Sequence, residues 1–83
     1  MCSTYILQSQ KDRTFYIGST GDLHKRIEKH NKGLSKYTKT KMPWKLVYKE
    51  EYETLSEAKK REYYLKSLKS KIVIEKLILG PIV

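Results

Sequence analysis

The chain has 83 residues, and its 18 lysines and arginines outweigh nine acidic residues to give a formal net charge of +9. This length predicts one small domain over residues 1–83, and the single cysteine excludes an intramolecular disulfide and leaves too few ligands for a structural zinc site. No apolar run approaches a membrane span and no signal-peptide pattern begins the sequence, so we expect a cytoplasmic protein without a membrane partner.

The first half of the sequence predicts a β-hairpin followed by a helix. Residues 4–8 and 14–17 are short β-prone runs on either side of a polar five-residue segment, as is typical of a hairpin. Capping residues at 19, 20 and 22 and a glycine at 33 predict a helix over about residues 21–32. The apolar side of this helix would consist of Leu23, Ile27 and Leu34. Residues 33–43 predict an exposed basic loop.

The second half predicts a strand and two helices. Residues 44–52 favour a third strand, with Trp44 as a core anchor. Thr54 and Glu57 have the spacing of a capping box and predict a helix that runs to about Lys69. Ser70 can cap a last short helix, which Gly80-Pro81 would end. The order β-β-α-β-α-α predicts an α/β fold of the α+β type, with a small, three-stranded, largely antiparallel sheet flanked by helices.

Positive charge is concentrated in one part of the chain. Between Lys25 and Lys45 there are eight lysines or arginines and one acid, Glu28. Such a confined basic excess is the electrostatic footprint of a polyanion-binding surface, although charge runs are also common on surfaces that bind no nucleic acid. The asymmetry favours a nucleic-acid partner. Tyr37, inside the basic loop, has no evident core role and could stack on a base.

The tripeptide Tyr16-Ile17-Gly18 opens the most informative stretch. Its tyrosine belongs to a predicted strand, its glycine predicts a turn, and the next helix carries Arg26 and His30 one turn apart. Tyr5 lies on the predicted partner strand. These side chains would meet at one strand-to-helix corner, where a phosphate could be held and a proton moved. Taken singly, each has a structural alternative: packing for the tyrosines, a core position for the histidine, and a stem along the core for the arginine.

A carboxylate falls on the inward face of the second long helix. The apolar stripe of that helix consists of Leu55, Ala58, Leu65 and Leu68. Glu62 lies inside this stripe, where a buried charge is unfavourable unless a cation or hydrogen-bond donors receive it. A divalent ion is one explanation, because Mg²⁺ is commonly held by one or two protein carboxylates. An ion pair with Arg26 and a stripe displaced by one residue are the others. Lys66, one turn further, could approach the same phosphate.

With these residues in place, the sequence resembles the GIY-YIG nuclease superfamily over essentially its whole length, and looks most like the small stand-alone bacterial UPF0213 group. The second signature is intact as Tyr16-Ile17-Gly18, whereas Ser3-Thr4-Tyr5 stands where Gly-Ile-Tyr would be and keeps only the tyrosine. The helix arginine, the histidine and the metal-binding glutamate of the family fall on Arg26, His30 and Glu62. Some relatives carry a lysine directly after the YIG glycine, where this chain has Ser19, so Lys66 or a loop lysine would have to supply that charge.

The resemblance implies an endonuclease that hydrolyses phosphodiester bonds with one Mg²⁺ or Mn²⁺ ion held by Glu62. Arg26 would stabilise charge on the phosphate, and Tyr5 would position water or phosphate. Tyr16 would take a proton from the attacking water, with His30 orienting it or relaying that proton. A phenol has a pKa of about 10 and needs nearby positive charge to act as a base, whereas an imidazole does not. The expected nucleic-acid contacts are Lys32, Lys36, Tyr37, Lys39, Lys41 and Lys66.

DNA is the expected substrate, and RNA stays open. A domain of this size has little surface for reading bases, which favours selection of DNA structure over sequence, in a process such as DNA repair or recombination. The alternative is a non-catalytic DNA- or RNA-binding module that retains the nuclease fold. That alternative explains the charge but not an inward glutamate opposite an arginine and a histidine. Whether cleavage needs a partner protein also stays open.

Overall fold

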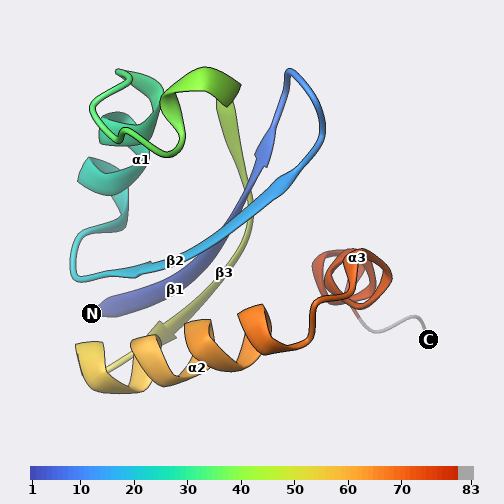
Figure 1. Ribbon diagram of the computed structural model, residues 1–83. Coiled ribbons are helices and arrows are strands. Elements are labelled where there is room, and N and C mark those ends of the chain that lie inside the picture. Colours follow the sequence, from blue (N-terminus) through green and yellow to red (C-terminus); the bar gives the residue numbers. More distant parts are fainter. Residues whose placement is uncertain (81–83) are drawn as a thin grey trace.

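The computed structural model describes residues 1–80, which form a three-stranded sheet with helices on both faces (Figure 1). The elements in chain order are β1 (Cys2–Ser9), β2 (Phe15–Thr20), α1 (Leu23–Asn31), the 3₁₀ helix η1 (Lys39–Lys41), β3 (Trp44–Tyr52), α2 (Leu55–Ser67) and α3 (Lys71–Leu79). The strand order is β2-β1-β3, and both outer strands are antiparallel to β1. The predicted fold class and the order of strands and α-helices are therefore confirmed. Within residues 1–80, no helix has the length and apolar character needed to cross a membrane.

The sheet separates two hydrophobic clusters. On β1, alternate side chains point to opposite faces, so Tyr5 and Leu7 pack with Trp44 on the face that α1 covers. Ile6 points the other way and packs with residues of α2 and α3. Figure 1 shows this arrangement, with α1 on one side of the strands and α2 and α3 on the other. Because both outer strands are edges, the rim of β2 is open between the two helical layers.

Two polar anchors fix α2 on the sheet. Thr4, which is fully buried on β1, donates a hydrogen bond from Oγ1 to the carbonyl oxygen of Ala58 at 2.6 Å. On β3, Glu50 accepts two hydrogen bonds from the Arg61 guanidinium, at 2.8 and 3.1 Å. A bidentate pair of this kind fixes orientation as well as distance. Together these contacts determine where α2 presents the next residue, Glu62.

Two predicted features of the first half are wrong. Strand β2 does not end in a turn at Gly18 but continues to Thr20, because Gly18 pairs with Tyr5 and Thr20 with Ser3 across the hairpin. Helix α1 begins after Asp22, whose carboxylate accepts a hydrogen bond from the Lys25 amide, and it ends at Asn31.

Two residues assigned to apolar helix stripes are instead exposed. Leu34 lies beyond the end of α1, and 65% of its surface is accessible to solvent. Leu55 is the first residue of α2 and is 40% exposed, because the helix projects past the edge of the apolar contact at that end. The stripe that α2 does bury is formed by Ala58 and Leu65.

The segment from residue 33 to 43 is more ordered than the predicted exposed loop. It contains η1, and Thr38 within it is completely buried. Asn31 holds the end of the segment against α1, since its side-chain amide donates to the Trp44 carbonyl oxygen and accepts from the Trp44 amide, at 3.0 and 2.7 Å. Trp44 itself is buried, as predicted for a core anchor.

The last helix begins where its cap predicts. The Ser70 hydroxyl accepts a hydrogen bond from the Val73 amide, and α3 then runs to Leu79. Gly80 follows with a φ of 77°, a left-handed conformation that glycine adopts readily. Pro81, the other half of the predicted stop, lies outside the described residues.

Candidate active site

A cleft of about 420 Å³ opens at the β2 edge of the sheet. Strand, helix and hairpin residues from four elements line it: Tyr5, Tyr16, Gly18, Ser19, Arg26, Lys59, Glu62, Tyr63 and Lys66. Four of the five predicted catalytic residues, Tyr5, Tyr16, Arg26 and Glu62, therefore meet in one cavity. The fifth, His30, lies behind them in the core.

Gly18 is required by the tyrosine on the neighbouring strand. The hairpin register places Gly18 directly opposite Tyr5. A Cβ atom at residue 18 would lie 2.5 Å from the Tyr5 hydroxyl oxygen and 2.6 Å from Cζ, far inside van der Waals contact. Because Tyr5 is only 1% exposed, its ring has no free space into which it could move. The glycine thus leaves room for a buried phenol, rather than forming a turn.

His30 is held in the core by two hydrogen bonds. Its Nε2 lies 3.2 Å from the Tyr5 hydroxyl and its Nδ1 lies 2.8 Å from the Thr38 hydroxyl. Burial, together with the charges of Arg26 and Lys29, lowers the pKa of His30, so the imidazole is neutral at neutral pH. Burial also raises the pKa of Tyr5, which keeps that phenol protonated.

Contact between His30 and Tyr16 is through the rings. Their centroids are 5.0 Å apart and the rings meet edge to face. The hydrogen-bond partner of His30 among the tyrosines is Tyr5. The imidazole can therefore support the Tyr16 ring by packing, while its ring nitrogens are engaged with Tyr5 and Thr38.

The lowered pKa of His30 predicts a pH-dependent stability. An unfolded histidine titrates near pH 6.5, and the folded state binds its proton only at lower pH, so the unfolded chain binds more protons below about pH 6.5. The contribution of His30 to the free energy of unfolding is therefore complete above that pH and is lost as the pH falls toward the folded pKa. Urea denaturation between pH 5 and 8 should show this loss in the wild type.

The matched control for this prediction is His24, which is exposed on α1. We expect His30→Gln to remove this part of the pH dependence, whereas His24→Gln should keep it. An unchanged pH profile in His30→Gln would show that another group is responsible.

Glu62 accepts two hydrogen bonds within the cleft. Ser19 donates its hydroxyl to Oε1 at 2.5 Å, and the Lys66 ammonium lies 2.6 Å from Oε2. Burial alone would raise the pKa of Glu62, but the hydrogen bonds from Lys66 and Ser19 and the charges of Lys66 and Lys59 outweigh it and lower the pKa. The carboxylate is thus charged at neutral pH. Within residues 1–80, its ion-pair partner is Lys66 and not Arg26.

The comparisons with known proteins agree with this geometry. A family model described as the GIY-YIG catalytic domain matches residues 1–76. The chain belongs to the GIY-YIG family. It is 47% identical over 62 residues to the UPF0213 protein YazA of Bacillus subtilis, a match that covers 74% of this chain and 63%, less than two thirds, of that protein. A UPF0213 protein of Staphylococcus aureus is 53% identical over 64 residues, which are 76% of this chain and 77% of the relative.

A solved structure has the same fold. The solution structure of a UPF0213 protein from Bacillus halodurans superposes with a TM-score of 0.58 at 36% identity, over 94% of this chain and 83% of that one. The GIY-YIG and UPF0213 resemblance drawn from the sequence is therefore confirmed.

The donor atoms of the GIY-YIG cleft suit a hard divalent ion. Its anionic ligand is one carboxylate, that of Glu62, with the Ser19 hydroxyl beside it. Mg²⁺ and Mn²⁺ accept oxygen ligands, and Mg²⁺ usually keeps several waters, so one carboxylate can suffice. In residues 1–80, no three histidine, cysteine or acidic side chains converge in the way a zinc site requires. An ion at Oε2 would take the place that the Lys66 ammonium has here.

Positive charge in the GIY-YIG cleft comes from α1 and α2. Arg26 lies on α1, and Lys59 and Lys66 lie on α2. Lys66, rather than any lysine of the 33–43 segment, is therefore positioned to compensate for the serine at position 19. Lys59 and Tyr63 were not predicted, although positions 59, 62, 63 and 66 have the i, i+3, i+4, i+7 spacing that shares one helix face. Thr38 was also missed, because a short polar residue carries no signal of burial.

The predicted nucleic-acid contacts are dispersed. Lys32 forms an ion pair with Glu28 at 2.8 Å, and Lys41 one with Asp12 at 3.4 Å. Lys36 and Lys39 are exposed on the 33–43 segment. Tyr37 is 78% exposed, with its ring centroid 5.9 Å from that of Tyr16. Of the predicted set, Tyr37 and Lys66 are thus the two that adjoin Tyr16.

Proposed function

We propose that this chain is a metal-dependent endonuclease that hydrolyses phosphodiester bonds in DNA. The observation that carries the proposal is the cleft that Glu62, Arg26 and Tyr16 share at the open edge of the sheet. A charged carboxylate, a guanidinium and a phenol in one cavity can respectively bind a cation, stabilise a phosphate and accept a proton. Membership of the GIY-YIG family supports this chemistry.

Each side chain has a role that its surroundings favour. Glu62 and Ser19 would hold the ion, whose charge polarises the scissile phosphate and stabilises the leaving oxygen when it is bound. Arg26, which has no ion-pair partner within residues 1–80, is available to stabilise negative charge on the phosphate. Tyr16 accepts the proton of the attacking water. Tyr5 and His30 are positioning residues, because their hydrogen bond fixes the wall against which Tyr16 packs.

The geometry of the cleft favours recognition of DNA shape. It lies at an edge between two helical layers and presents lysines, an arginine and phenols, groups that contact phosphates and exposed bases. We propose that the chain selects branched, nicked or partly unpaired DNA, that residues 1–83 act as one domain, and that repair or recombination intermediates carry such structures.

The test is a cleavage assay with the whole chain. Labelled linear duplex, single-stranded, flap and branched DNAs are incubated with Mg²⁺, Mn²⁺ or EDTA, and the products are separated on denaturing gels. We expect cleavage of at least one structured substrate with either metal and none with EDTA. Binding without cleavage under every condition would overturn the proposal and favour a non-catalytic nucleic-acid-binding module.

A further inference from the structure

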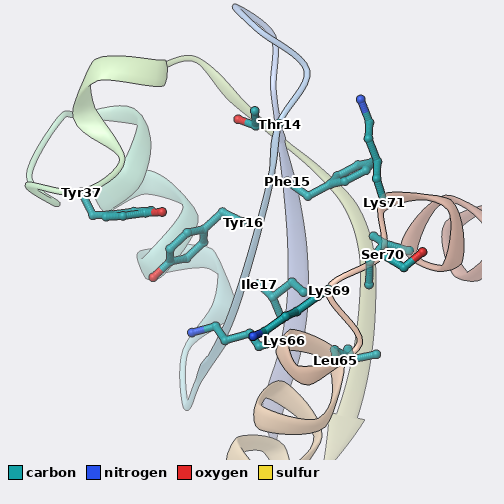
Figure 2. A pocket seen from close by; sticks show the side chains of 11 residues that line it. Thr14, Phe15, Tyr16, Ile17, Tyr37, Leu65, Lys66, Lys69, Ser70 and Lys71 are labelled. Carbon is teal, nitrogen blue, oxygen red and sulfur yellow. The ribbon is translucent and has the colours of Figure 1, made fainter.

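A second hollow adjoins the cleft on the outer side of β2. This groove has a volume of about 660 Å³ and shares Tyr16 and Lys66 with the cleft. It passes over the edge of β2 from the segment that carries Tyr37 to the junction of α2 and α3 (Figure 2). Whatever lies in the groove would therefore continue directly into the proposed active site.

One end of the groove is aromatic. The exposed Tyr37 ring is inclined by 43° to the Tyr16 ring, at a centroid separation of 5.9 Å. Phe15, the next residue along β2, faces the opposite side of the sheet and lines the groove there. Aromatic rings on both sides of one strand edge offer planar surfaces on which successive bases can stack.

The other end of the groove is basic. Lys66, Lys69 and Lys71 line it, and none of the described lining residues is acidic. In Figure 2 the side chains of Lys66 and Lys69 extend toward the part of the groove where Tyr16 lies. Within residues 1–80, Lys69 and Lys71 have no ion-pair partner, so their charges are available to a polyanion.

Lys69 has an unusual backbone for its residue type. Its φ is 48°, in the left-handed region where a residue with a Cβ atom is disfavoured by about 1–2 kcal/mol relative to glycine. The chain therefore has a lysine at a helix end where glycine would be more favourable. A strained position that keeps a charged side chain is a reason to assign that side chain a role.

We infer that the groove binds an unpaired DNA strand that leads away from the scissile phosphate. Its bases stack on Tyr37 and its phosphates contact Lys69 and Lys71. A duplex fits this lining less well, because paired bases hide the faces on which a ring can stack, whereas a single strand exposes both bases and phosphates. The inference rests on the proposed function and narrows it, since the substrate then carries an unpaired stretch beside the cleavage point.

The experiment measures binding without cleavage. Fluorescence anisotropy in EDTA compares a labelled oligothymidylate with a duplex of equal length. Loss of one stacked base corresponds to about 1–3 kcal/mol, so Tyr37→Ala should weaken single-strand binding about 5- to 150-fold and leave duplex binding nearly unchanged. Tyr37→Phe, which keeps the ring, should bind like the wild type. Lys69→Ala should flatten the salt dependence on the single strand by about 0.7.

The matched controls lie outside the groove. Tyr64→Ala removes another solvent-accessible phenol, on α2, and Lys49→Ala removes an exposed lysine on β3, the opposite edge of the sheet. Equal losses on both DNAs in Tyr37→Ala, or losses as large in the controls, would overturn the inference. Because EDTA removes any metal-dependent reaction, a chain that cleaves nothing could still show the single-strand preference, and an active nuclease could lack it. The two proposals can thus fail separately.

Discussion

Glu62→Gln is expected to lower the rate of metal-dependent cleavage by at least about 10²–10³-fold and to leave DNA binding equal or stronger. The amide is a neutral and weaker ligand, so the cleft loses its anionic donor for the ion and with it the stabilisation of charge on the phosphate. Removal of a negative charge also reduces repulsion toward DNA. Initial cleavage rates at increasing Mg²⁺ and anisotropy in EDTA measure the two effects independently.

Glu51→Gln is the control for this substitution, because Glu51 is an exposed acid on β3. It changes the net charge by the same amount without touching the cleft, so its cleavage rate should stay close to that of the wild type. If Glu62→Gln kept full activity, the assignment of the metal-binding carboxylate would be wrong and the mechanism would have to be abandoned.

Gly18→Ala is expected to destabilise the fold by about 1–3 kcal/mol, as is typical of forced overpacking. Two atoms of the Tyr5 ring would lie 2.5 and 2.6 Å from the new methyl group, and burial prevents the ring from turning away. The same displacement would disturb the hydrogen bond to His30 and the wall behind Tyr16, so cleavage should fall as well. Urea denaturation monitored by tryptophan fluorescence measures the loss of stability.

A double-mutant cycle tests whether the Tyr5 ring is the cause. Tyr5→Leu removes the outer ring atoms, so Gly18→Ala in that background should be neutral or stabilising by up to about 1 kcal/mol, the usual gain when alanine replaces glycine without strain. An equal cost of Gly18→Ala in both backgrounds would instead attribute the effect to the backbone of β2.

The elements that the sequence predicts well are those with strong local signals. Helix α2 has a capping box at Thr54 and an amphipathic pattern, and it begins where the cap predicts. The strand ends are predicted less well, because Ser3, Ser19 and Thr20 carry no apolar signal and are held in the sheet by backbone pairing with the neighbouring strand. The burial of Thr38 depends on His30, which is distant enough along the chain that no local pattern indicates the contact.

The candidate site shows the same division. Helical spacing was sufficient to single out Arg26 and Glu62, and the structure places both in one cleft. Their actual partners were not predictable in this way, because the Ser19–Glu62 hydrogen bond joins residues 43 positions apart from different elements. The conformation of Lys69 was likewise hidden, since lysine is not a residue that predicts a left-handed backbone.

The pairing of Tyr5 with Gly18 bears on how distant members of the family can be found. The first of the two signature triplets is reduced to its tyrosine here, and Thr4 within it has acquired another task, the hydrogen bond to Ala58 that anchors α2. A search pattern that requires two consecutive triplets penalises such a chain. A pattern that requires a tyrosine on one strand and, directly across the hairpin, a glycine followed two strands of contacts away by an acidic helix residue would accept it. The cross-strand pair is fixed by steric fit, so it should persist in chains whose neighbouring positions have drifted.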